Sequence, residues 1–343
     1  MPPFLVLTDL DGTILPPPVG GVTPPLSEGG VCLEPLVRLL GLGCTIVAVT
    51  GSKLDTHRRL FFDALPLAAR QTGRILMAVE TGKRMYRSQP DGDLVEDVRY
   101  ATFSTSRAPP LEAATVEELV EIGRTGIKRF YQDAAHEGAN LVPEVLKQYI
   151  GTKDALDPPV TTDRSRYPRV EVREGNGSVV FAGVPAAVGL RYFSVPSQLK
   201  GHVDGKPTGR YSFDCVPAGL SKALVVEFLG ETGTGELTRG RGLAIGDQPL
   251  GNDIGLTRQH DLGLPFVSVS ERADMVPAHL ASCHVTRMSN ADASCAVLSV
   301  LAKRLEQEAT VSCGPGSDAS GSPQLTADVA VKLVRDINDA PGV

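Results

Sequence analysis

Three features that mark particular classes of protein are missing from this sequence. No two cysteines are spaced as Cys-x-x-Cys, and no histidine–cysteine cluster has the spacing of a zinc site, which argues against a structural zinc protein. No stretch approaches the roughly 18 consecutive apolar residues of a membrane-spanning helix. The net charge is −6 without any run of lysine and arginine, so neither a nucleic-acid partner nor an anionic membrane surface is indicated.

The overall composition is that of a folded, soluble protein. The 343 residues are 42% hydrophobic, which is enough for a sizeable core and for two domains. Six scattered cysteines fit a reducing compartment. The apolar run at residues 4–7 is too short for a signal peptide. We therefore expect a cytoplasmic protein, and the sequence carries no signal of its oligomeric state.

Alternating apolar runs and helical segments predict a parallel sheet built from both ends of the chain. Strands are expected at 4–8, 44–49, 75–79, 243–245 and 265–269, and helices at 33–42, 54–65, 221–229, 273–281 and 291–308. A strand–helix–strand order requires right-handed crossovers and parallel pairing. The fold class expected is α/β, with a Rossmann-like parallel-sheet core.

The middle of the chain has a different pattern and predicts an inserted α+β domain. Helices are expected at 115–123 and 128–150 and a strand at 210–216, and the Gly175-Asn176-Gly177 turn between alternating segments predicts a β-hairpin. We expect a core of residues 1–82 and 205–310 and a cap of residues 83–204. Residues 311–343 are expected to hold a linker, at 312–323, and a C-terminal helix, at 326–338.

The segment Asp9-Leu10-Asp11-Gly12-Thr13 places two carboxylates at the end of the first strand. They lie on the same side of the chain because side chains alternate along an extended strand. A carboxylate can attack phosphorus and form an aspartyl-phosphate, and a second one can serve as acid and then as base. We expect Asp9 to be the nucleophile and Asp11 the acid/base. For this motif alone, an Asx-type turn without catalysis is the alternative.

Two further segments carry groups that bind phosphate. Thr50-Gly51-Ser52 follows the second strand, where a hydroxyl and free backbone N–H groups could hold phosphate oxygens. A helix cap explains the same residues equally well. Lys222 follows Ser221 at the start of a helix, where a positive charge is unfavourable unless an anion is near. We expect Lys222 to pair with Asp9 and the transferred phosphoryl group.

The loop 246–253 is rich in oxygen ligands and follows another buried strand. Magnesium prefers one or two carboxylates together with phosphate and water oxygens. Asp247 is the expected direct ligand, Asp253 is expected to bind a metal-bound water or to orient Lys222, and Asn252 could contribute its amide. A polar loop with Asn-Asp turn chemistry is the alternative for this segment alone.

Together and in this order, the Asp-x-Asp-Gly-Thr, Thr-Gly-Ser, Ser-Lys and Gly-Asp…Asn-Asp segments resemble the four motifs of the haloacid dehalogenase (HAD) superfamily. The insert is similar to the large α+β cap of its Cof-like and sugar-phosphatase branch. The resemblance implies a Mg²⁺-dependent phosphohydrolase acting on a small phosphorylated substrate such as a sugar phosphate. It also implies metal binding by Asp9, Asp11, Asp247 and Asp253, with the carbonyl of Leu10 completing the metal shell.

The last motif departs from the common pattern of that branch. It reads Gly-Asp-Gln-Pro-Leu-Gly-Asn-Asp, two residues longer than Gly-Asp-x-x-Asn-Asp. Phosphomannomutases of the superfamily also have a longer loop here, so a sugar phosphomutase is a second hypothesis. A catalytically inactive binding protein with the same fold is a third.

Overall fold

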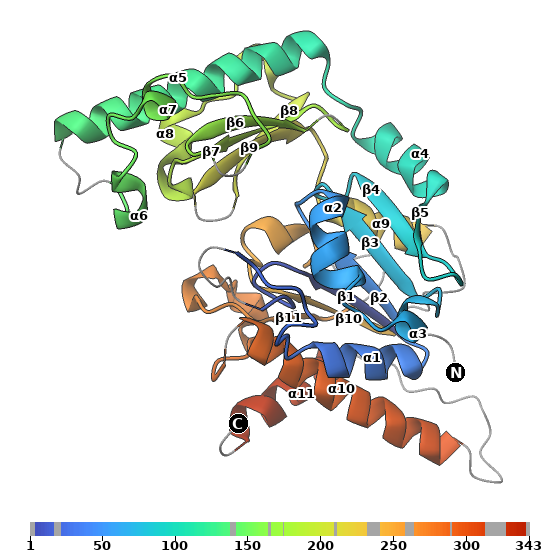
Figure 1. Cartoon of the computed structure of the whole chain (residues 1–343). Coiled ribbons are helices and arrows are strands. Elements are labelled where there is room, and N and C mark those ends of the chain that lie inside the picture. Colours follow the sequence, from blue (N-terminus) through green and yellow to red (C-terminus); the bar gives the residue numbers. More distant parts are fainter. Residues whose placement is uncertain are drawn as a thin grey trace. The chain divides into compact units, whose positions relative to one another are not determined.

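Figure 1 shows the computed structural model of the chain. The structure describes residues 4–16, 22–137, 142–163, 166–173, 175–208, 211–231, 241–257, 264–288, 290–312 and 327–340. It divides into two compact units: unit 1 comprises residues 1–103 and 221–343, and unit 2 comprises residues 104–220. Each unit has its own sheet. Among the described residues, no helix is long and apolar enough to cross a membrane.

Unit 1 is built on a seven-stranded sheet with the order β11-β10-β1-β2-β3-β4-β5. Strands β1 (Leu5–Asp9), β2 (Thr45–Val49), β3 (Ile75–Val79), β10 (Gly242–Gly246) and β11 (Phe266–Ser268) are parallel, whereas β4 (Arg84–Ser88) and β5 (Leu94–Glu96) are antiparallel additions at one edge. The five parallel strands are buried throughout, as expected for a sheet covered on both faces. The predicted α/β class and parallel core are confirmed.

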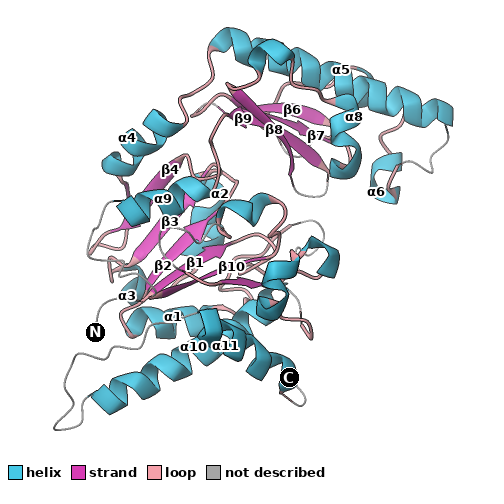
Figure 2. Cartoon of the chain, turned by 180° about the vertical axis from the view of Figure 1, so that it is seen from behind, coloured by secondary structure: helices cyan, strands magenta, loops and turns pink. Residues whose placement is uncertain are grey.

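Two apolar layers cover this sheet, because successive residues of each strand point to opposite faces. On one face, Val6 and Ile46 pack with α1 (Leu33–Gly41), α10 (Asn290–Ser312) and α11 (Ala327–Asp339). On the other, Leu7 and Val47 pack with α9 (Ala223–Glu231) and α4 (Val98–Arg107). Figure 2 shows α1, α10 and α11 together on one side of the sheet.

Short helices complete unit 1. They are α2 (Leu54–His57), a π-helical turn (Arg58–Phe62), α3 (Leu67–Arg70) and 3-10 turns at Asn252–Gly255, Ala273–Met275 and Ala278–Cys283. The helix expected at 273–281 is thus two 3-10 segments. The C-terminal helix docks on the core, since Leu333, Val334 and Ile337 of α11 are buried. The expected linker, 312–323, lies outside the described residues apart from Ser312, which ends α10.

Unit 2 is a four-stranded antiparallel sheet, β6-β7-β9-β8, covered by the long helix α5 (Figure 1). The predicted hairpin is β6 (Arg169–Arg173) and β7 (Ser178–Ala182), with β8 (Val203–Thr208) and β9 (Ser212–Pro217) beside it. The helices are α5 (Ala113–Glu137), α6 (Glu144–Lys147), α7 (Lys153–Leu156) and α8 (Gly189–Tyr192), with 3-10 turns at Ala186–Val188 and Ser197–Leu199. The inserted α+β unit is therefore present.

The boundaries between the two units differ from the domain boundaries expected after residues 82 and 204. The first division lies after Phe103, because β4 and β5 extend the unit 1 sheet and α4 packs on it. The second lies after Leu220, because β8 and β9 both pair within the unit 2 sheet. The helices expected at 115–123 and 128–150 form one helix, α5, as far as Glu137. The second expected helix is wrong beyond this point: residues 138–141 lie outside the described residues, and α6 covers only Glu144–Lys147.

Candidate active site

Three loops meet at the edge of the unit 1 sheet where its parallel strands end. Strand β1 pairs in parallel with β2 on one side and β10 on the other. Their carboxyl ends therefore lie together, and ligands bind at this edge of open parallel sheets. Asp9 ends β1, Thr50 follows β2, and Asp247 follows β10. The three motifs, which are far apart in the sequence, thus lie together in the folded chain.

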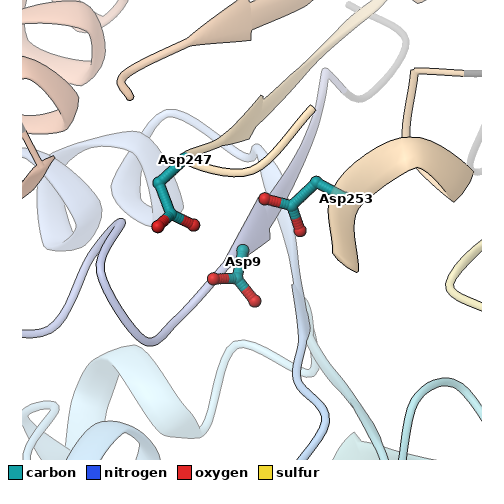
Figure 3. Close-up of side chains that lie close together, drawn as sticks. All are labelled: Asp9, Asp247 and Asp253. Atoms are coloured by element: carbon teal, nitrogen blue, oxygen red, sulfur yellow. The ribbon is translucent and has the colours of Figure 1, made fainter. Parts of the chain in front are cut away.

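The carboxylates of Asp9, Asp247 and Asp253 face one another in this cluster (Figure 3). One oxygen from each lies within 4.8 Å of the others. Lys222 is fully buried beside them, and its Nζ donates to Oδ1 of Asp9 and, at 2.7 Å, to Oδ1 of Asp253. The predicted pairing of Lys222 with Asp9 is therefore present in the structure.

The buried charges of this cluster shift one another's pKa values. Burial raises the pKa of Asp9 well above its usual range; Lys222 opposes this shift, and Asp253 and Asp247 add to it. Burial together with Asp253 raises the pKa of Asp247 to about 7. For Lys222, burial lowers the pKa, but the charges of Asp253 and Asp9 outweigh it and hold the pKa above its usual range. Without a further cation, the cluster carries more negative charge than one lysine neutralises.

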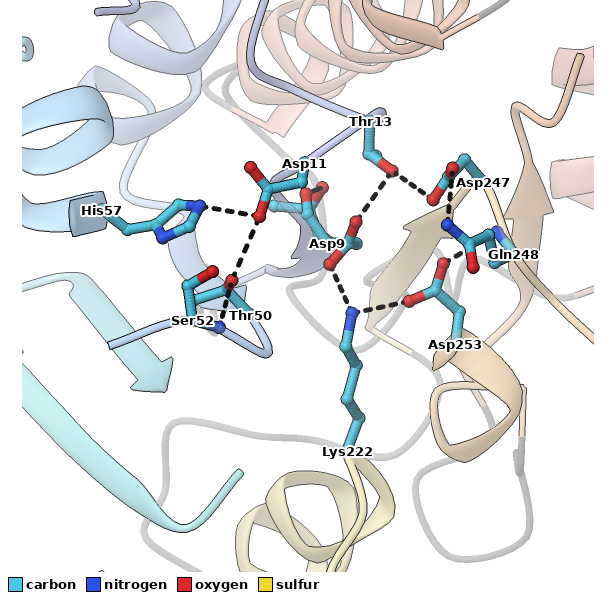
Figure 4. A network of polar contacts seen from close by, with 11 residues as sticks. Asp9, Asp11, Thr13, Thr50, Ser52, His57, Lys222, Asp247, Gln248 and Asp253 are labelled. Carbon is cyan, nitrogen blue, oxygen red and sulfur yellow. Dashed lines mark hydrogen bonds and ion pairs between the residues drawn. The ribbon is translucent and has the colours of Figure 1, made fainter. Parts of the chain in front are cut away.

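The first loop touches the last one directly. Gly12 has a φ of 77°, and a Cβ on it would come within 2.8 Å of Oδ2 of Asp247. A side chain at position 12 would therefore be strained by the left-handed backbone conformation and would clash with the carboxylate of Asp247. The hydroxyl of Thr13 lies 3.4 Å from Oδ2 of Asp9 and 3.5 Å from Oδ1 of Asp247, between the two acids (Figure 4).

The carbonyl of Leu10, an expected metal ligand, lies inside the tight turn of the first loop. Its oxygen accepts backbone N–H groups of Thr13, Ile14 and Leu15, at 3.3, 3.0 and 3.0 Å. These bonds form the tight turn that follows Asp9 and aligns Thr13. This carbonyl therefore shapes the loop, and its expected ligation of the metal stays a prediction.

Asp11 points away from the carboxylate cluster, towards the second loop (Figure 4). Its side chain is 54% exposed, whereas that of Asp9 is 6% exposed. Oδ2 of Asp11 lies 3.5 Å from the Thr50 hydroxyl and 2.9 Å from Nε2 of His57. Although they are only two residues apart, the two carboxylates thus occupy different environments, and in the structure Asp11 does not join the metal-type cluster with Asp9.

A hydrogen bond to the hydroxyl of Thr50 closes the loop Thr50-Gly51-Ser52. The Ser52 N–H donates to Oγ1 of Thr50 at 3.1 Å. Gly51 is open: a Cβ there would have only Oγ1 of Thr81, at 3.7 Å, and Nδ2 of Asn252, at 3.8 Å, within 4 Å among the described residues. The amide of Asn252 therefore lies beside the expected phosphate loop.

The longer loop of the last motif forms a turn that is closed by its own hydrogen bonds. The N–H groups of Gly251 and Asp253 both donate to the carbonyl of Gln248, at 2.9 and 3.0 Å. The Gln248 N–H in turn donates to Oδ2 of Asp253 at 3.0 Å. This turn brings Asp253 back beneath β10, where it receives Lys222. Its two oxygens are thus engaged by protein donors, which favours the role of orienting Lys222.

The donor set fits a hard divalent cation such as Mg²⁺. It offers carboxylate oxygens from Asp9 and Asp247, the number that Mg²⁺ takes from protein when phosphate and water fill the remaining positions. A divalent cation would also offset the excess negative charge that raises the pKa values of both acids. Asp9 and Asp247 are therefore the residues that would hold the ion.

This charge imbalance predicts that Mg²⁺ stabilises the folded protein. We expect the melting temperature to rise when EDTA is replaced by Mg²⁺, by the equivalent of about 2–3 kcal/mol at a hundredfold excess over Kd. Differential scanning calorimetry at matched ionic strength measures the shift. In Asp247→Asn the response should disappear while stability in EDTA is retained or raised. An equal shift in wild type and variant would show that Mg²⁺ binds elsewhere.

No family model and no curated protein matches this sequence. Among solved structures, the chain is similar to a Plasmodium falciparum IMP-nucleotidase at 11% identity and a TM-score of 0.49, with 89% of this chain and 68% of that chain covered. It is also similar to Aspergillus fumigatus trehalose-6-phosphate phosphatase at 14% identity and a TM-score of 0.47, covering 88% and 93%.

Three residues of the site were not predicted from the sequence. Thr13 belongs to the first motif, so its spacing from Asp9 could have indicated a hydroxyl in the turn. Gln248 belongs to the last motif, but its contact with Asp253 depends on the loop conformation. His57 is a lone histidine in a short helix, and nothing in its sequence context indicates a site.

Proposed function

We propose that this chain is a Mg²⁺-dependent phosphohydrolase that cleaves a phosphate monoester of a small metabolite, a sugar phosphate, through an aspartyl-phosphate intermediate. The observation that carries the proposal is the contrast between Asp9 and Asp11. Asp9 is buried against Lys222, and Asp11 is half-exposed beside Thr50 and His57. Two acids held in such different environments are suited to different catalytic roles.

In the first step an oxygen of Asp9 attacks phosphorus, and the bond between phosphorus and the leaving oxygen breaks. The leaving oxygen takes a proton from Asp11, so the alcohol departs neutral. Lys222 stays on Asp9 and stabilises negative charge on the transferred group. The backbone and hydroxyls of Thr50-Gly51-Ser52 orient the phosphoryl oxygens. A bound Mg²⁺ would supply charge neutralisation and orientation of the phosphoryl group.

In the second step water attacks the phosphorus of the aspartyl-phosphate. Asp11, now a carboxylate, accepts the proton of the water, and the bond from phosphorus to Asp9 breaks. The products are inorganic phosphate and the original Asp9 carboxylate. Because Asp11 is protonated again at the end, the cycle balances with one water consumed for each ester cleaved.

The test is phosphate release from a panel of phosphorylated compounds, with Mg²⁺ and with EDTA. The panel should contain hexose phosphates, trehalose 6-phosphate, a nucleoside monophosphate and p-nitrophenyl phosphate. We expect release only with Mg²⁺ and fastest from a few sugar phosphates. Release that is fastest from the nucleotide would keep the reaction and change the substrate class.

Two outcomes would favour the alternative hypotheses. A sugar phosphomutase would isomerise its substrate and respond to a sugar bisphosphate instead of releasing phosphate. A protein that binds Mg²⁺ but turns over no compound would be the inactive binding protein. The panel therefore needs an assay for isomerised sugar phosphate beside the phosphate assay.

A further inference from the structure

His57 is a buried histidine at the edge of the candidate active site. It ends α2 (Leu54–His57), the short helix that begins directly after the Thr50–Ser52 loop. Its side chain is 1% exposed, although the neighbouring Asp11 is half-exposed. Figure 4 shows the ring pointing from α2 towards the Asp11 carboxyl group. The imidazole is thus fixed by its surroundings on the side of Asp11 remote from the carboxylate cluster.

The contacts of His57 and Thr50 fall on the same oxygen of Asp11. Nε2 of His57 lies 2.9 Å from Oδ2, and Oγ1 of Thr50 lies 3.5 Å from it. Two polar groups beside one oxygen restrict the orientation of the carboxyl group, and the other oxygen lies on the side away from them. This is the geometry required to aim the other oxygen at a leaving group.

Both ring nitrogens of His57 are buried. Among the described residues, neither ring nitrogen of His57 has a partner in full hydrogen-bond geometry, and Nδ1 is completely buried. The contact between Nε2 and Asp11 nevertheless has the length of a hydrogen bond, 2.9 Å, and catalytic contacts often become better aligned when substrate binds.

A buried imidazole without a satisfied hydrogen bond destabilises the fold, and an apolar side chain of similar size would avoid that cost. The geometry points to His57 as a positioning residue for Asp11. Nε2–H donates to Oδ2 and holds the carboxyl group so that the other oxygen meets the leaving oxygen and later the attacking water. This inference rests on the proposed function, because it assigns the group that orients the proposed acid/base.

The role is tested by comparing His57→Gln with His57→Leu. Glutamine places an N–H near the position of Nε2, whereas leucine fills the volume without a donor. We expect His57→Leu to lower kcat/KM for alkyl phosphates roughly ten- to a hundred-fold. The loss should be much smaller for p-nitrophenyl phosphate, whose leaving group needs little protonation. KM should stay near wild type, and His57→Gln should recover most of the loss.

A matched control is His284→Leu. His284 is also buried in unit 1, with Nε2 3.0 Å from the carbonyl oxygen of Ser270. Removing it perturbs packing similarly, but it should not change the dependence on the leaving group. In an Asp11→Asn background, His57→Leu should have almost no further effect, because the group that it orients is gone.

The outcomes separate the two proposals. If the wild-type protein is active and His57→Leu has the same kcat/KM for alkyl phosphates, the positioning role is wrong and the proposed function stands. Equal losses for alkyl and aryl esters, without recovery in His57→Gln, would also overturn it. Wild type that turns over no compound would overturn the proposed function, and the positioning role with it.

Discussion

Replacing Asp9 with asparagine should abolish turnover, lowering kcat roughly 10⁴- to 10⁶-fold, as the loss of a covalent nucleophile does in other enzymes. The fold should persist, because asparagine has the same shape and its amide oxygen can still accept from Lys222. The change also removes one of three mutually repelling carboxylates. Steady-state phosphate release and a thermal melt measure both parts of this prediction.

A rapid acid quench with labelled substrate gives an independent readout. Wild type should yield a labelled phosphoenzyme, and Asp9→Asn should yield none. The control is Asp274→Asn, which makes the same chemical change at a carboxylate that is 66% exposed and paired with Arg272. Labelled Asp9→Asn protein, or turnover near that of wild type, would remove Asp9 from the mechanism.

Replacing Lys222 with methionine should cost both activity and stability. The ammonium group is fully buried and contacts both Asp9 and Asp253. Removing one partner of a buried ion pair leaves uncompensated charge, which typically costs about 3–5 kcal/mol. We therefore expect a lower denaturant midpoint and no measurable phosphate release. Urea unfolding, monitored by circular dichroism, gives the change in free energy of unfolding.

A second substitution distinguishes lost charge balance from lost packing. Lys222→Met combined with Asp253→Asn removes a charge of each sign, and it should be more stable than Lys222→Met alone. Lys303→Met, on the exposed side of α10, is the control for removing a lysine. If the double variant is less stable than the single one, packing around the lysine stem accounts for the loss.

The parallel core could be predicted from the sequence because its strands are unbroken apolar runs. A run such as Leu5–Thr8 is buried on both faces, so its composition alone indicates a covered parallel strand. The motifs follow these strands directly, and parallel strands deliver their ends to one edge. The positions of Asp9, Thr50 and Asp247 at that edge were therefore predictable without knowledge of the loops.

Glycine misled the prediction of α5. The sequence placed a break between residues 123 and 128, where Gly123 and Gly126 lower helix propensity. In the structure a Cβ on Gly123 would come within 2.4 Å of Phe181, and one on Gly126 within 2.5 Å of Phe193. The glycines let the helix approach the aromatic core of unit 2, a tertiary reason that local propensity does not contain.

The strands that were not predicted from the sequence contain few of the residues that favour strands. Strand β8 contains Gly205 and Pro207, and it lies at the edge of its sheet, where a proline is tolerated. Strands β4 and β5 carry charged residues at partly exposed positions near one edge of the unit 1 sheet. His57 was missed for a different reason: its importance comes from Asp11, which is distant in sequence and adjacent only after folding.

The position of β1 also determines when the site comes into existence. During synthesis β1 is made first and β2 soon after, but its other neighbour, β10, follows only after the whole of unit 2. The strands of unit 2 are contiguous, so that unit can close while the first sheet is still incomplete. Asp9 and Asp11 therefore wait without Lys222 and Asp247 until a long loop closes, which is a slow step. Until then the nascent chain has Asp9 without the lysine and the second carboxylate that face it in the folded protein.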